Sequence, residues 1–358
     1  MQENKQKFTS GNVNYYIGQN SLKFLSDYLK NINRFFILVD ENTEVNCLPV
    51  LNKILSKDIT GDIIQIKSGE GNKNLNTCNL IWEKLTNFNA DRDNLVINLG
   101  GGVITDIGGF TASTYKRGMK FINIPTTLLG QVDAAIGGKT GVDFKEYKNH
   151  IGLFSNPESV FIDPVFLNTL NKRQLRSGFA EILKYAFIMD PMLTDIINNR
   201  SFSEIGNDWG KIIHKSAIDK ITVVEKDEKE NGFRKILNFG HTIGHALETW
   251  FLKTDNPITH GEAVAAGMIC ETWLSHEFTG LKEDEMDKII SLIDKSFERI
   301  IFKSDTFDDL LSLTKQDKKV RGGSSRYSLL KSSGEAVFDI PVEDNWMLRS
   351  LEFYIMDK

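Results

Sequence analysis

The first half of the chain alternates short apolar runs with stretches in which apolar residues recur at helical spacing. Runs typical of strands occupy residues 35–39, 63–66, 95–102 and 121–127. Between them, the stretch to about Leu55 and the stretch from Leu75 to Leu85 have the spacing of amphipathic helices. Strands that alternate with helices predict an α/β fold with a mostly parallel sheet.

The second half has longer amphipathic stretches and few runs typical of strands. These stretches occupy residues 173–188, 211–230, 238–252 and 261–276, and their length and period predict a largely α-helical region. A chain of 358 residues exceeds the size at which one hydrophobic core usually stops growing. The change of pattern near residue 170 therefore predicts two domains, residues 1–170 and residues 171–358.

Composition and charge exclude several classes of protein. The chain is 41% hydrophobic and 25% charged, as globular proteins usually are, and its net charge of -5 gives no global attraction for nucleic acid. Its three cysteines, Cys47, Cys78 and Cys270, form no CxxC pattern, which favours a reducing compartment. No segment reaches the roughly 20 apolar residues that span a bilayer, and residues 1–18 do not resemble a signal peptide. We therefore expect a cytoplasmic protein with neither a nucleic-acid nor a membrane partner.

Three glycines, Gly100 to Gly102, directly follow a predicted strand. Glycines at this position let backbone N–H groups approach a pyrophosphate at the start of the next helix, although Thr105 breaks the full GxGxxG spacing. Asp40 ends an earlier strand, where a carboxylate can bind ribose hydroxyls or cap the following helix. Residues 68–73, SGEGNK, are either a plain loop or the adenosine side of the same site. Together these features favour a dinucleotide cofactor.

Residues 133–149 read DAAIGGKTGVDFKEYKN and place Lys139 and Lys148 among glycines and polar donors. Such a loop can bind a phosphate or a carboxylate, and the alternative is an ordinary solvated surface loop. The nucleotide-binding pattern GxxxxGK[ST] is not met, because position 133 is Asp where that pattern needs glycine. The sequence therefore predicts a local anion site of a different kind.

Three histidines and one glutamate are candidate metal ligands. His241 and His245 are four residues apart in GHTIGHALE, on one face of a predicted helix, and His260 precedes the next helix. Catalytic zinc usually takes three protein ligands, and Glu181 in GFAEILKY offers a carboxylate, with Lys184 one turn later. The alternatives are buried core histidines and a surface ion pair of Glu181 with Lys184. Spacing does not decide which of His241 and His245 binds metal, and the lack of HExxH excludes that class of metalloprotease.

Six motifs together resemble the 3-dehydroquinate synthase family. In chain order they are GGGVITD, PTTLLGQVDAAIGGKTG, KNHIG, AEILKY, DEKENGFRKILNFGHTIGHALE and HGEAVAAGM, and they lie within residues 68–276. The resemblance implies a Rossmann-like amino-terminal domain that binds NAD, a helical carboxy-terminal domain that binds metal and substrate, and a homodimer. It also implies zinc, with cobalt as an alternative metal, and a phosphorylated sugar acid as the substrate.

The resemblance also assigns roles to individual residues. The metal ligands would be Glu181, His241 and His260, whereas His245 would lie in the active site without binding metal. NAD contacts would come from Asp40, Asn42, Ser68, Gly69, Glu70, Gly71, Asn72, Lys73, Gly101, Gly102, Val103, Ile104, Thr105, Asp106, Thr126, Thr127, Lys139, Lys148, Phe166, Leu167, Asn168 and Thr169. Catalytic contacts with substrate would come from Asp133, Lys139, Lys184, Lys220, Arg234, Asn238 and His245. The phosphate would be bound by Lys148, Asn149 and the neighbouring subunit's copy of Arg117, with a contribution from Lys318 or Lys319.

The implied reaction converts 3-deoxy-D-arabino-heptulosonate 7-phosphate to 3-dehydroquinate and phosphate, in the shikimate pathway to chorismate and the aromatic amino acids. NAD takes and returns a hydride, phosphate leaves by β-elimination and an intramolecular aldol reaction closes the ring, so the overall class is a carbon–oxygen lyase. The alternatives are another sugar phosphate cyclase, a metal-dependent polyol dehydrogenase or an inactive NAD-binding protein. Arg234, Asn238 and His245 favour the acid substrate. Thr105 and Ser177 depart from the family pattern near NAD.

Overall fold

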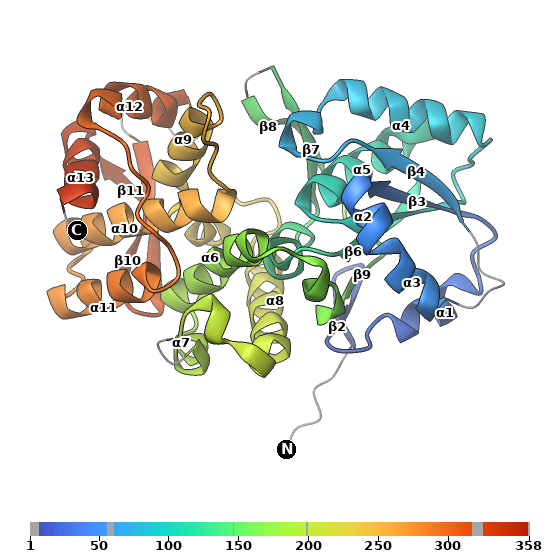
Figure 1. Ribbon diagram of the computed structural model, residues 1–358, viewed down its shortest axis with the longest axis horizontal. Helices are drawn as coiled ribbons and strands as arrows, with labels where there is room; N and C mark the ends of the chain where they lie inside the picture. The colour runs from blue at the N-terminus through green and yellow to red at the C-terminus, as the bar shows by residue number, and fades with distance from the viewer. Residues whose placement is uncertain (1–6, 56–60, 146, 198–199, 317–324, 357–358) are drawn as a thin grey trace. The chain divides into compact units, whose positions relative to one another are not determined.

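The computed structural model describes residues 7–55, 61–145, 147–197, 200–316 and 325–356. Its internal contacts divide the chain into two compact units (Figure 1). The first consists of Met1–Asn171 with Ile213–Glu225, and the second of Lys172–Ile212 with Lys226–Lys358. Helix α8 (Trp209–Lys226) therefore contributes residues to both units.

The first unit is built on a seven-stranded sheet with the strand order β1-β2-β9-β6-β5-β3-β4. The strands are β1 (Lys7–Ser10), β2 (Val13–Ile17), β3 (Phe35–Asp40), β4 (Asp62–Ile66), β5 (Leu95–Gly100), β6 (Lys120–Pro125) and β9 (Ser159–Ile162). Strands β1 and β2 pair antiparallel, and the other neighbours pair in parallel. The predicted mostly parallel sheet is confirmed, and the antiparallel pair at one edge was not predicted.

Helices cover both faces of this sheet. They are α1 (Lys23–Leu29), α2 (Glu41–Asn46), α3 (Leu48–Ile54), α4 (Leu75–Asn87) and α5 (Gly102–Thr114). Phe35 and Ile37 of β3 pack on one face with residues of α1 and α3, whereas Phe36 and Leu38 pack on the other face with α4 and α5. Burial on both faces explains why the central strands read as continuous apolar runs. The helical stretch expected up to Leu55 is two helices, because a second helix starts with Pro49 in its first turn.

A separate two-stranded hairpin forms where the sequence predicts a glycine-bearing loop. It consists of β7 (Lys139–Phe144) and β8 (Tyr147–Phe154), and it follows a helical turn at Gly130–Ala134. Its strands approach closely at Gly152, where a Cβ atom would lie 2.5 Å from the Thr140 carbonyl oxygen. The Asp143 amide donates to the Lys73 carbonyl oxygen at 2.8 Å, which attaches the hairpin to the start of α4.

The second unit is largely helical, as predicted. Its helices are α6 (Lys172–Ile188), α7 (Pro191–Ile197), α9 (His241–Phe251), α10 (His260–Thr279), α11 (Glu283–Asp294), α12 (Phe307–Gln316) and α13 (Asp344–Met356). Helix α10 is central, because it contacts α6, α9, α11, α13 and the hairpin of β10 (Ser325–Ser332) with β11 (Glu335–Val342). Among the helices that the structure describes, none has the length and apolar composition needed to cross a membrane.

Candidate active site

The carboxyl ends of β4, β3, β5 and β6 lie along one edge of the parallel sheet. Asp40 ends β3, Ser68 to Lys73 follow β4, Gly101 follows β5 and Thr126 follows β6. The connection after β4 crosses to the other side of β3, so a change of chain direction falls between β3 and β5. Ligands of open α/β sheets bind at such a point. The structure therefore brings most of the NAD candidates to one edge.

The glycine loop forms an open helix start at this edge. Gly101 precedes the first turn of α5 and, as a glycine, offers no capping side chain of its own. A Cβ atom on Gly101 would lie 2.8 Å from Thr127 Cγ2, and one on Gly102 would lie 3.2 Å from Ala134 Cβ, so the backbone itself forms the surface. The Thr105 hydroxyl donates to the Gly102 carbonyl oxygen at 3.1 Å, inside the helix. The first-turn N–H groups and the positive end of α5 suit a pyrophosphate.

Asp40 has the helix-capping role that the sequence left open. Its Oδ1 accepts from the Thr43 amide at 2.8 Å, and the Asp40 amide donates to Thr43 Oγ1 at 2.8 Å. Asn42 lies in the same helix, α2, and is exposed. In the segment Phe166–Thr169, the Phe166 side chain is fully buried in the core. Phe166 can therefore contribute only backbone atoms to a ligand.

Lys73 joins the cofactor candidates to a phosphate candidate. It is only 3% exposed, and its Nζ donates to Asp106 Oδ2 at 2.6 Å and to Asn149 Oδ1 at 2.5 Å. Burial alone would lower the Lys73 pKa, but the charges of Asp106 and Glu70 outweigh it and raise the pKa above its ordinary value. Asn149 has a φ of 49° and its amide donates to Asp143 Oδ1 at 2.7 Å. The hairpin, α5 and the turn after β4 thus meet at one buried ammonium group.

Four other substrate candidates also lie in the first unit, namely Lys148, Lys139, Lys220 and Asp133. Lys148 Nζ is 4.0 Å from Glu70 Oε1, and Lys139 is exposed at the start of β7. Lys220 comes from the part of α8 that belongs to this unit, and its Nζ donates to Asp133 Oδ1 at 2.8 Å. The Lys220 side chain is 8% exposed, so this ion pair is largely shielded from solvent.

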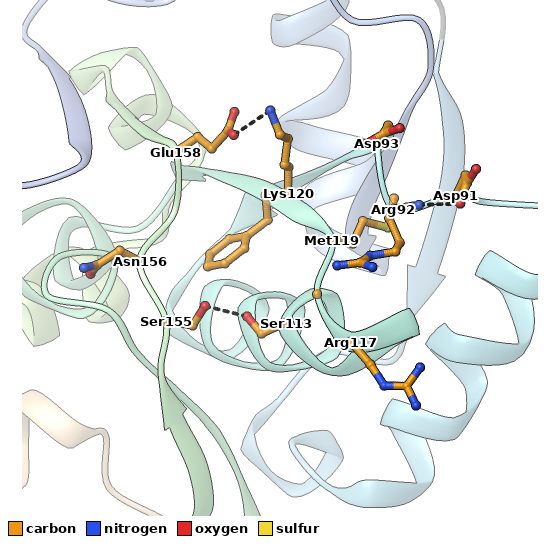
Figure 2. A pocket seen from close by; sticks show the side chains of 12 residues that line it. Asp91, Arg92, Asp93, Ser113, Arg117, Met119, Lys120, Ser155, Asn156 and Glu158 are labelled. Carbon is orange, nitrogen blue, oxygen red and sulfur yellow. Dashed lines mark hydrogen bonds and ion pairs between the residues drawn. The ribbon is translucent and has the colours of Figure 1, made fainter.

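Arg117 lies at the other end of α5, about 20 Å along a 13-residue helix from the glycine loop. It is exposed and lines a surface pocket of about 740 Å³ together with Lys120 and Glu158, which form an ion pair at 2.9 Å. Figure 2 shows the Arg117 guanidinium pointing away from this pair. The structure thus separates Arg117 from the glycine loop of its own chain. Lys318 and Lys319 lie outside the described residues.

In the second unit, Glu181, His241 and His260 converge from three different helices. Glu181 is fully buried in α6, His241 is the first residue of α9, and His260 is the first residue of α10. Glu181 Oε1 is 3.5 Å from His241 Nε2 and 3.5 Å from His260 Nε2. The three ligand atoms all lie within 4.8 Å of one another. Three candidates that come from positions up to 79 residues apart in the sequence are therefore neighbours in space.

These separations suit a tetrahedral metal ion. Zinc bonds of about 2.0–2.1 Å to nitrogen and oxygen, at tetrahedral angles, separate ligand atoms by roughly 3.3–3.4 Å. The Glu181 to histidine distances of 3.5 Å are close to that value. The His241 Nδ1 atom is 3.1 Å from the Phe239 carbonyl oxygen, which leaves Nε2 to face Glu181. One carboxylate with two imidazoles is a usual donor set for catalytic zinc.

His245 belongs to a second group, with Glu248 and His260. His260 Nδ1 is 3.2 Å from Glu248 Oε2, so its two ring nitrogens face two carboxylates. Burial alone would lower the His260 pKa, but the charges of Glu248 and Glu181 outweigh it and raise the pKa to about 10. The two carboxylates around His260 therefore favour a positive charge at this position. Because Glu248 faces the nitrogen that does not point at Glu181, it suits the role of an orienting partner.

Lys184, Arg234 and Asn238 complete the predicted set in this unit. Lys184 is 1% exposed and contacts Glu181 Oε2, so the pair is buried and not on the surface. Arg234 is 1% exposed, and its Nη1 donates to the Glu228 carbonyl oxygen at 2.6 Å. Asn238 Nδ2 donates to Glu230 Oε1 at 2.9 Å. Arg234 and Asn238 lie in one turn, at Phe233–Asn238, which packs against α6.

Glu248 and Asp227 are acidic residues near these side chains that sequence reasoning missed. Glu248 is seven residues after His241 on α9, two turns along the same face, and this spacing could have identified it. Asp227 accepts from the amides of Gly232 and Arg234 at 2.7 and 3.1 Å, and so holds the turn that carries Arg234. No spacing signal points to Asp227, because its partners are backbone amides.

Two synthases are among the solved structures that share this fold. ValA (2-epi-5-epi-valiolone synthase) from Streptomyces hygroscopicus subsp. jinggangensis 5008, with NAD+ and Zn2+ bound, is 26% identical, has a TM-score of 0.86, and is matched over 98% of this chain and 99% of that chain. A 2-deoxy-scyllo-inosose synthase complexed with carbaglucose-6-phosphate, NAD+ and Co2+ is 23% identical, with a TM-score of 0.85 and 96% of each chain covered. The fold is that of the sugar phosphate cyclases.

Sequence comparison narrows this class to one family. The models of the 3-dehydroquinate synthase N-terminal and C-terminal regions match residues 63–177 and 178–320. The 3-dehydroquinate synthase of Parabacteroides distasonis is 40% identical over 338 residues, which cover 92% of this chain and 94% of that protein. The chain belongs to the 3-dehydroquinate synthase family. The predicted family is therefore confirmed.

Proposed function

We propose that this chain is an enzyme that converts 3-deoxy-D-arabino-heptulosonate 7-phosphate to 3-dehydroquinate and phosphate. The observation that carries the proposal is the convergence of Glu181, His241 and His260 beside the buried ammonium of Lys184, in a chain of this family. This donor set fits a divalent cation, zinc or cobalt, and the glycine loop before α5 fits NAD. When bound, NAD would accept and return a hydride, and the cation would act as a Lewis acid on a substrate hydroxyl.

The residues of the chain supply binding and charge. Lys184 and Lys220 would stabilise negative charge on substrate oxygens, because each is a buried ammonium group paired with a carboxylate. The planar guanidinium of Arg234 can bind both oxygens of the substrate carboxylate. Lys148 and Asn149 would bind the phosphate from the hairpin, and His245 would lie beside the metal site. The donors of Arg234 support a substrate with a carboxylate over a sugar phosphate that lacks one.

We further propose that residues 1–170 bind NAD and residues 171–358 bind the metal and substrate. The enzyme would be a cytoplasmic homodimer in which Arg117 serves the phosphate site of the partner subunit. Its exposed position at the far end of α5 from the glycine loop supports this arrangement. The three cysteines are buried and unpaired, which suits a reducing compartment.

The activity is tested with purified protein, zinc, NAD and 3-deoxy-D-arabino-heptulosonate 7-phosphate. We expect phosphate and 3-dehydroquinate to appear together, and sedoheptulose 7-phosphate, which lacks the carboxylate, to be a poor substrate. Consumption of sedoheptulose 7-phosphate with neither expected product would overturn the proposal.

Subunit mixing tests the role of Arg117. Arg117→Ala and Lys184→Ala should each be inactive alone. If Arg117 acts in the partner's site, random mixing restores up to about a quarter of wild-type activity, because half of the dimers carry one intact site of two. No restoration in a mixture shown to contain heterodimers would contradict the arrangement.

A further inference from the structure

Glu271 is a fully buried carboxylate on α10 that has none of the roles described above. It accepts hydrogen bonds from three backbone amides at the start of α9. Its Oε2 accepts from Gly240 at 2.7 Å, and its Oε1 accepts from Thr242 at 3.1 Å and from Ile243 at 3.3 Å. The Thr242 and Ile243 amides are the ones that a side chain at the capping position would bind, and the Gly240 amide is the one that the third helical residue binds in a capping box. Here the cap comes from a different helix.

The close packing of α9 on α10 explains why the cap is not local. Gly240, at the capping position of α9, has a φ of 78° and no side chain. A Cβ atom on Gly240 would overlap Met268 Cγ and lie 3.0 Å from the Val264 carbonyl oxygen, both on α10. No capping side chain fits there, yet buried N–H groups require acceptors. Glu271, one turn beyond Gly267 on α10, supplies them.

The same contacts control the position of His241. His241 is the first residue of α9, between Gly240 and Thr242, whose amides both bind Glu271. The His241 ring is oriented by the Phe239 carbonyl oxygen, but the place of the ring depends on the backbone of this first turn. The positive end of α9 adds to the attraction for the Glu271 carboxylate.

We propose that Glu271 is a positioning residue for the metal site. By fixing the first turn of α9, it holds His241 Nε2 at the distance from Glu181 that a tetrahedral cation requires. This inference rests on the proposed function, because it assumes that Glu181, His241 and His260 bind a divalent cation. Glu271 itself does not touch the cation or the substrate.

The test replaces Glu271 with glutamine, which keeps the size and shape but brings an NH2 group against amide donors. The zinc dissociation constant is measured by competition with a chelator, and the visible spectrum is recorded with cobalt(II). We expect Glu271→Gln to bind zinc roughly 10–100-fold more weakly and to show altered cobalt bands. The matched control is Asp190→Asn, because Asp190 is also a buried carboxylate, just before α7, and accepts a hydrogen bond at 3.1 Å from the amide of Met192 in the first turn of that helix. The control should keep wild-type affinity and spectrum.

The outcomes separate this inference from the proposed function. If wild-type protein does not bind zinc, the proposed metal site itself fails. If wild-type protein binds zinc and Glu271→Gln matches it in affinity and cobalt spectrum, the role of Glu271 is overturned. If Glu271→Gln does not fold, amide hydrogen exchange of the zinc-free wild-type protein tests the role of Glu271 instead. Slow exchange at Gly240, Thr242 and Ile243 supports a turn held by Glu271, whereas fast exchange there overturns the inference.

Discussion

Replacing Lys73 with methionine would remove a buried charge while keeping most of the side-chain volume. Lys73 Nζ is bonded to Asp106 Oδ2 at 2.6 Å and to Asn149 Oδ1 at 2.5 Å. Both partners would lose their donor, and the Asp106 carboxylate would remain beside an apolar side chain. The change therefore perturbs two places together: the sheet edge that carries the NAD candidates, and the hairpin of β7 and β8 that carries Asn149.

The expected loss of stability depends on how far the ion pair of Lys73 with Asp106 is shielded from solvent. At 2.6 Å and an effective dielectric constant of about 20, the attraction between Lys73 and Asp106 is about 6 kcal/mol. Desolvation of the two ions offsets most of this, so the intact pair contributes little net stability. Removing only Lys73 leaves the Asp106 carboxylate, whose side chain is 19% exposed, without its partner, which costs up to about 3–5 kcal/mol. Adding Asp106→Asn removes that charge. The free energy of unfolding of the double variant should therefore be about 1–3 kcal/mol higher than the sum of the two single losses predicts.

Urea unfolding of wild-type, Lys73→Met, Asp106→Asn and the double variant measures these free energies. Lys30→Met is the matched control, because Lys30 is paired with Asp27 at 2.7 Å but their side chains are 68% and 74% exposed. The control should change the free energy of unfolding by less than about 1 kcal/mol. The reasoning is refuted if Lys73→Met is no more destabilising than Lys30→Met, or if the two changes in the buried pair are additive.

Two further changes test the helices that carry the metal candidates. Glu248→Gln should weaken zinc binding roughly 10–100-fold, because it removes the carboxylate that faces His260 Nδ1; wild-type affinity in a chelator competition would contradict this role. Gly267→Ala should cost about 3 kcal/mol by thermal unfolding, at the upper end of the usual range for overpacking, because its Cβ atom would overlap the Gly240 carbonyl oxygen where α9 meets α10. The control, Gly210→Ala, has no heavy atom within 4 Å of the new Cβ, and an equal loss in both variants would remove the packing argument.

The sequence predicted the main elements of the fold because their patterns are local. The apolar run at residues 95–102 and the glycines that end it were enough to place a strand before an open helix start. The hairpin of β10 and β11 was missed because β10 is buried on both faces along most of its length and lacks the alternation of polar and apolar residues that identifies a strand. Its burial depends on α10, which is distant in sequence.

The residues of the candidate site were likewise predictable only in part. Motif spacing identified Glu181, His241 and His260 as candidates, but the residues alone left His245 as an alternative ligand, and only the resemblance chose between them. Glu271 could not be predicted, because its partners are backbone amides of another helix and no residue pattern marks them. The structure shows that Asp40 caps α2, which is one of the two roles that the sequence allowed, the other being to bind ribose hydroxyls.

The central claim is that one divalent cation is bound by Glu181, His241 and His260. An anomalous difference map recorded at the zinc absorption edge, from crystals of the zinc-loaded protein, tests it most directly. We predict one strong peak, with the Glu181 carboxylate and Nε2 of both histidines at about 2.0–2.2 Å. A peak bound by His245 in place of His241, or no peak between these three side chains, would contradict the account.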